Sequence, residues 1–357
     1  CLGILAHGPG AGLFRSGADG PELQRLTLER VVFGETDAFV NIELPEGVPQ
    51  IISIGGSAID LRPVMEGLFD ASDEEDDATD AMQVVISEQS PVAEIRLGEE
   101  TRLTGAFGTF LNDGTDWSDV ELRGRLSNGG RIFLRVKPEG EARKLTFESD
   151  DAGGVLSALD WIDTIRGGEM RVLGQISGSG DAEVIAGQLD MQNFLLTDGP
   201  IGAQILALTS FSGIADVLGG EGLTFRRVEV PFTVTDKEIT IKEGKARGAD
   251  IGILASGRID RETDQLELTG EIAPAYTLNS LLADIPLIGT VLSGGADGIF
   301  AATFRVGGSL DDPDVSVNPL SVLTPGIVRR LLTGFGSEDG PNAGNNEELQ
   351  PSEDEGG

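Results

Sequence analysis

The sequence contains almost no side chains of the kinds that perform acid–base or nucleophilic chemistry. Its 357 residues include one cysteine (Cys1), one histidine (His7) and one tyrosine (Tyr276). A disulfide within the chain needs a second cysteine, and a structural zinc site needs several cysteine or histidine ligands. Nucleophilic catalysis requires a base close to the nucleophile. We therefore expect no enzyme activity, no catalytic residues, no metal site and no cofactor.

Long apolar runs are also absent. None approaches the ~20 residues that a membrane-spanning helix requires. The chain begins at Cys1 and not at a methionine. This start predicts either a fragment or a processed product whose first residue carries lipid. If the full protein is anchored in a membrane, we expect the anchor to lie outside this segment.

Positive charge is scarce. The chain has 26 basic and 60 acidic residues, which gives a formal net charge of −34. A field of that sign repels phosphate backbones, so we expect no nucleic-acid partner. Glycine is abundant at 51 residues and aromatics make up only 5%. Together with many short segments rich in Val, Ile, Leu and Thr, this composition favours an extended, mainly β architecture.

The most regular pattern is the alternation of apolar and polar side chains over residues 225–272. A period of two places the apolar side chains on one face of a β-sheet and the charged ones on the other. Polar segments at 235–238, 242–245 and 260–264 predict turns between the strands. This region is therefore predicted to be an antiparallel meander with one apolar face.

Similar alternating segments recur along the chain, and groups of them are followed by segments of helical periodicity. Strands are predicted over 24–33, 38–44, 50–55, 92–97, 101–109, 120–126, 131–136, 145–148, 170–176, 184–196 and 299–306. Short amphipathic helices are predicted over 59–69, 155–166, 203–218, 278–292 and 327–332. Ser127–Gly130 has the composition of a hairpin turn. The acidic run at 70–80 lacks the spaced ligands of a calcium loop, which favours a charged linker.

The C-terminal third carries several more specific stretches. Residues 225–241 have a strand–turn–strand pattern, and residues 249–260 form a strand that ends in Gly-Arg-Ile-Asp. Residues 276–295 contain Ile-Pro-Leu-Ile-Gly and Leu-Ser-Gly-Gly, and residues 304–313 contain Val-Gly-Gly-Ser-Leu-Asp-Asp-Pro. In these stretches, over about 194–336, the chain resembles the C-terminal region of AsmA-like proteins of the YhdP/TamB type from the Gram-negative cell envelope.

This resemblance implies a long, twisted, U-shaped antiparallel sheet, or β-groove, with a few short amphipathic helices. It also implies a periplasmic protein whose apolar groove carries phospholipid between the inner and outer membranes and supports outer-membrane biogenesis. The inner membrane would be reached through a missing N-terminal anchor, and the outer membrane would be met at the C-terminal end. The implied lining residues of the groove are Val120, Leu122, Leu126, Val228, Val230, Phe232, Val234, Ile239, Ile241, Ile251, Ile253, Ile259, Leu266, Leu268 and Ile272.

The expected organisation has four parts. A β-groove segment over 1–69 ends in a short helix, and an acidic linker follows over 70–81. The groove continues over 82–336, and an acidic tail at 337–357 is predicted to be disordered. The alternative is a non-catalytic scaffold of the cell envelope with a closed β core, because most half-apolar sheets are covered by protein.

Overall fold

The computed structural model of the chain describes residues 10–17, 20–62, 81–97, 101–159, 161–197, 222–248, 251–274, 302–310 and 313–318. The predicted helices at 203–218, 278–292 and 327–332 lie outside these residues, as do the acidic run at 70–80 and the acidic tail. The 276–295 stretch, which carries much of the family resemblance, also lies outside them.

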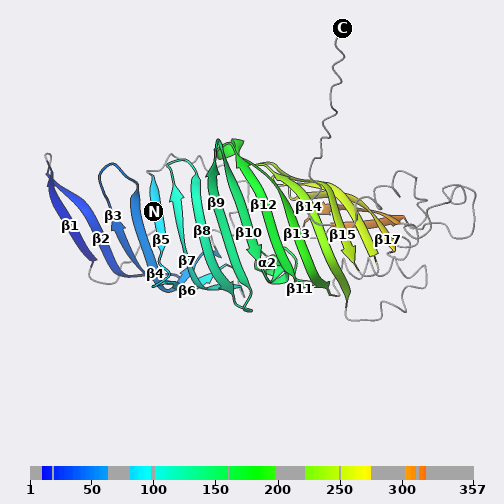
Figure 1. Ribbon diagram of the computed structural model, residues 1–357, viewed down its shortest axis with the longest axis horizontal. Coiled ribbons are helices and arrows are strands. Elements are labelled where there is room, and N and C mark those ends of the chain that lie inside the picture. The colour runs from blue at the N-terminus through cyan, green and yellow to red at the C-terminus, as the bar shows by residue number, and fades with distance from the viewer. Residues whose placement is uncertain are drawn as a thin grey trace, which may run out of the picture.

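The described chain is mainly β-strand, and its strands form one 19-stranded sheet. They lie side by side along the long axis of the molecule (Figure 1). The strands are β1 (Gly10–Gly17), β2 (Gly20–Phe33), β3 (Thr36–Glu43), β4 (Gln50–Asp60), β5 (Met82–Ile86), β6 (Val92–Arg96), β7 (Arg102–Asn112), β8 (Trp117–Leu126), β9 (Arg131–Glu139), β10 (Ala142–Ser149), β11 (Ile165–Arg166), β12 (Glu169–Ser177), β13 (Val184–Leu196), β14 (Leu223–Val234), β15 (Glu238–Gly248), β16 (Ile251–Asp260), β17 (Gln265–Pro274), β18 (Ala302–Ser309) and β19 (Pro313–Asn318).

Most neighbours in this sheet are also neighbours in the sequence. Antiparallel pairing runs from β1 to β4, from β7 to β10, and from β12 to β19. Strand β10 pairs with β12, and the short β11 pairs with β13 beyond the end of β12. Strands β5 and β6 share one position between β4 and β7, and β11 and β12 share one beside β13, so at ~4.8 Å per position the sheet is roughly 75 Å long. The predicted long β-sheet is confirmed, and its form is consistent with a β-groove.

The sheet is mixed, which corrects the purely antiparallel prediction. Strand β4 pairs in parallel with β5 and, further along its length, with β6. A parallel neighbour requires the chain to return to the start of the strand before it enters the sheet again. Met82, the first residue of β5, lies opposite Gln50, the first residue of β4, so both strands start at the same edge of the sheet. Ile59, which was predicted to begin a helix, belongs to β4.

One predicted turn is also wrong. Residues 242–245 lie inside β15, where the pairing with β16 shifts register between Ile241 and Gly244. This β-bulge adds one residue to β15. The face that carries odd-numbered residues such as Ile239 before the bulge therefore carries even-numbered residues such as Ala246 after it. In the sequence, this change of phase has the same signature as a polar turn. The described part of β15 extends to Gly248, so the reversal into β16 comes after that residue.

Other predicted turns are confirmed. In the hairpin between β8 and β9, the Leu126 amide donates to the Gly130 carbonyl at 2.7 Å, and Gly129 has a φ of 98° that glycine adopts without strain. Between β16 and β17, the Asp260 carboxylate accepts the Thr263 amide at 2.9 Å.

The structure has one α-helix among its described residues, α2 (Ala152–Ala158). The Asp151 carboxylate caps it by accepting the Gly154 amide at 3.1 Å. A Cβ atom at Gly153 would lie 2.4 Å from the Ile165 carbonyl oxygen, so the helix approaches β11 closely only because residue 153 is glycine. The predicted helix over 155–166 is too long, because residues 165–166 pair with β13 as β11.

Within the described part of the chain, three buried clusters stabilise the sheet. The largest combines apolar side chains of α2 with those of β8, β11 to β14, β16 and β17, and we call it the α2 cluster. The rings of Phe194 and Phe225 stack within it at 5.3 Å between centroids. Its buried members are Leu126, Ala152, Val155, Leu156, Ala158, Ile165, Met170, Met191, Phe194, Leu223, Phe225, Ile251 and Ile272. A second cluster contains Ile86, Val92, Ile95, Leu103 and Ala106, and a third contains Val120, Val136 and Ile176.

Candidate functional site

The pairing register places apolar side chains of successive strands on one face of the sheet. Leu134 lies opposite Leu122 on one side and Phe147 on the other, and Leu189 lies opposite both Val172 and Val230. Directly opposed residues share a face because the side-chain period of a strand is two. The same relation links β2 to β18, and we call this side the apolar face. It includes Leu26, Leu28, Val40, Ile42, Ile52, Ile54, Val84, Phe110, Leu122, Leu134, Phe147, Val172, Leu189, Val230, Ile253, Leu268 and Val306.

All fifteen predicted lining residues lie on the apolar face, but their exposure differs. Eleven are half-buried: Leu122, Val228, Val230, Phe232, Val234, Ile239, Ile241, Ile253, Ile259, Leu266 and Leu268. Four are buried in closed clusters: Val120, Leu126, Ile251 and Ile272. The four buried side chains pack against other side chains of the protein and are not accessible to a ligand. The accessible lining therefore consists of the other eleven residues and their neighbours on the apolar face.

The apolar face therefore has a closed part and an open part. Near α2, the side chains of Met170 and Met191 are only 6% and 4% exposed. Beyond these methionines, Val172, Leu189 and Val230 form a cross-strand row that stays half-buried, and Leu189 packs against the edge of the α2 cluster. All described strands belong to the same sheet, and they leave this row partly open to solvent.

Sequence reasoning missed a large part of this lining. Residues on β2 to β5 and β9 to β13, such as Val40, Leu134 and Leu189, continue the apolar face. Their alternation was visible in the sequence. However, alternation alone does not say which of a strand's two faces is shared with its neighbour, and the register supplies that information.

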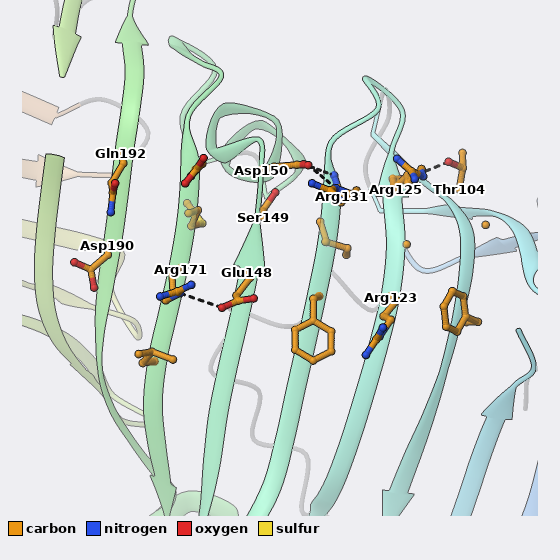
Figure 2. A pocket seen from close by; sticks show the side chains of 18 of the residues that line it. Thr104, Arg123, Arg125, Arg131, Glu148, Ser149, Asp150, Arg171, Asp190 and Gln192 are labelled. Atoms are coloured by element: carbon orange, nitrogen blue, oxygen red, sulfur yellow. Dashed lines mark hydrogen bonds and ion pairs between the residues drawn. The ribbon is translucent and has the colours of Figure 1, made fainter. Parts of the chain in front are cut away.

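The opposite face carries charged side chains and contains a cleft that the sequence did not predict. The cleft has a volume of about 1000 Å³ and extends from β7 to β14. Figure 2 shows Arg123 and Arg125 from β8, Arg131 from β9, and Glu148 and Asp150 from β10 and its end lining this hollow. We call it the arginine cleft. Its residues were missed because they are far apart in sequence and match no recognised motif.

Ion pairs hold most of the charged groups in this cleft. Arg131 Nε donates to Asp150 at 2.6 Å, and Arg171 Nε lies 3.0 Å from Glu148. The Arg131 side chain and backbone amide both donate to Asp150, and these bonds hold the pKa of that carboxyl below its usual range. The pairs are largely exposed, so each contributes little to stability.

The lowered pKa of Asp150 predicts a specific dependence of stability on pH. A carboxylate whose folded pKa lies below its unfolded value of about 3.9 stabilises the fold above that pH. The stabilisation disappears as the pH falls through the folded pKa. We expect wild type to exceed Asp150→Asn in thermal stability at pH 6 and to lose this advantage progressively as the pH falls below about 4. Thermal melts over this range check it, and a difference independent of pH would contradict it.

Within the described residues, no group of three or more His, Cys, Asp or Glu side chains is arranged to hold a metal ion. None of the helices in the described ranges is long and apolar enough to cross a membrane. In comparisons with known proteins, no family model, no curated protein and no solved structure matches the chain.

Proposed function

We propose that the apolar face is a groove for the acyl chains of phospholipids, and that the chain is a periplasmic segment of a protein that carries lipid between the two membranes of a Gram-negative envelope. The observation that supports this proposal is the open part of the apolar face. The cross-strand row through Phe147, Val172, Leu189 and Val230 remains half-buried within a sheet roughly 75 Å long. The resemblance to AsmA-like proteins supplies the expected cargo and location.

The energetics of such a surface suit transport. Each buried methylene group contributes about 0.8 kcal/mol, so an acyl chain of ordinary length would be held firmly. The hydrophobic effect is not directional. The described lining residues are aliphatic or phenyl side chains, which form no hydrogen bonds with an acyl chain. A bound lipid could therefore move along the row from strand to strand without a large barrier at any one residue.

Lipid cross-linking tests the proposal directly. A photoreactive amino acid at Val230 should cross-link to phospholipid when the protein is made in a Gram-negative host, and mass spectrometry of the adduct identifies the lipid. Thr233 provides the matched control, because it lies on the same strand and its side chain points to the polar face.

We expect adducts at Val230 and none at Thr233. Lipid adducts of equal yield at both positions would indicate non-specific labelling. The absence of adducts at Val230, together with no phospholipid co-purifying with the protein, would exclude the groove and favour a scaffold.

A further inference from the structure

We propose that the arginine cleft on the polar face binds a phosphate group through Arg125 and its neighbours. This site is separate from the proposed lipid groove, because the sheet itself lies between the two faces. The proposal does not depend on lipid transport.

The first observation is a group of arginines of which one keeps its charge uncompensated. Five arginines and four carboxylates line the cleft, and within the described residues every one of these arginines except Arg125 forms an ion pair. Every basic residue in the lining is arginine and none is lysine. The planar guanidinium group donates two parallel hydrogen bonds to phosphate or carboxylate oxygens, whereas lysine acts as a point charge. Arginine dominates the basic residues of the whole chain, so its presence here shows only that the cleft has the donor geometry that an oxyanion requires.

The second observation is an unfavourable pair within the sheet. Arg125 on β8 lies directly opposite Arg131 on β9, so both side chains project from the same face. Like charges in directly opposed positions destabilise a sheet. Arg131 is compensated by Asp150. The Arg125 guanidinium is exposed and forms no ion pair within the described part of the chain. An anion between the two guanidinium groups would remove this repulsion.

The surroundings of the pair suit an organic phosphate. Arg123 lies over the ring of Phe133, with its guanidinium carbon 4.9 Å from the ring centroid, and this contact restrains the side chain beside Arg125. The hydroxyl of Thr104 donates to the Arg125 carbonyl at 3.1 Å, which fixes the neighbouring edge of the cleft (Figure 2). A volume of about 1000 Å³ accommodates a group larger than a bare ion. The phosphate could belong to a soluble phosphomonoester or to an anionic lipid headgroup at a membrane surface.

Thermal melts with glycerol 3-phosphate test the site. At constant ionic strength set with sodium chloride, 10 mM glycerol 3-phosphate should raise the melting temperature of wild type by about 2 °C or more. Arg125→Gln should not respond, and without ligand it should melt at the wild-type temperature or about 1 °C above it, because the repulsion is removed. A merely structural role for Arg125 predicts the opposite, a lower melting temperature. Arg258→Gln is the control, since Arg258 is an exposed arginine paired with Glu267 on the same face and outside the cleft.

Co-sedimentation with vesicles of 30% phosphatidylglycerol in phosphatidylcholine distinguishes the two sources of phosphate. A response to glycerol 3-phosphate that depends on Arg125 supports a soluble ligand. Binding to the vesicles alone, weakened at least fivefold in Arg125→Gln, supports a lipid headgroup. The proposal is overturned if wild type responds to neither probe, or if Arg125→Gln responds to both as wild type does.

Discussion

Val230→Asp is expected to abolish phospholipid binding while leaving the fold intact. Val230 is half-buried on β14, opposite Leu189, and does not belong to the α2 cluster. A carboxylate there can remain hydrated because the surface is open, so the cost to stability should be only about 1 kcal/mol. The same charge lies in the proposed path of the acyl chain, where desolvating it would cost several kcal/mol. The measurement is the amount of phospholipid that co-purifies, with circular dichroism as the check on folding.

Thr233→Asp provides the matched control. It introduces the same charge on the same strand but on the polar face, so lipid binding should be unchanged. If Val230→Asp binds as much lipid as wild type, the open row is not the binding surface. If it unfolds instead, the row is covered in solution and the face is a closed core.

Ile251→Asp should have the opposite effect and unfold the C-terminal part of the sheet. Ile251 is 1% exposed and belongs to the α2 cluster together with Phe225 and Ile272. A carboxylate at this position would be buried without a partner, at a cost of several kcal/mol, or would force the cluster apart. Limited proteolysis and circular dichroism measure the loss of structure. We expect rapid cleavage in β14 to β17 under conditions that leave Val230→Asp resistant.

The conservative substitution Ile251→Ala checks that packing is the cause. Removing the buried side-chain atoms should lower the free energy of unfolding by about 2–5 kcal/mol, whereas Val230→Ala should cost clearly less because Val230 is already partly exposed. If Ile251→Ala and Val230→Ala lowered the free energy of unfolding by similar amounts, the distinction between closed and open parts of the apolar face would be wrong. The comparison needs local probes, because a sheet of this length need not unfold in one step.

Much of the fold could be predicted because strand periodicity is a local property. The alternation of Val228, Val230, Phe232 and Val234 identified both the strand and its apolar side, since each residue's direction follows from a period of two. The segment at 242–245 shows where this reasoning failed. A bulge shifts the phase of the alternation without ending the strand, and the sequence does not distinguish that shift from a turn. The parallel pairing of β4 with β5 and β6 was also not predicted, because it depends on contacts between segments that are distant in the sequence, and periodicity carries no information about such contacts.

The sequence by itself determined the mainly β fold class and the apolar or polar character of the two faces of the sheet. The scarcity of cysteine and histidine, the large negative charge and the repeated period of two are all read directly from the order of residues. Only the tertiary structure decided which apolar residues are closed and which are open, because Ile251 and Ile272 are buried in the α2 cluster whereas Val230 lies outside it and is half-buried. It also brought Arg125 opposite Arg131 and assembled the arginine cleft from seven strands. The burial of a side chain and the residue opposite it on the next strand both depend on register and packing between segments that are distant in the chain. No local sequence pattern encodes them.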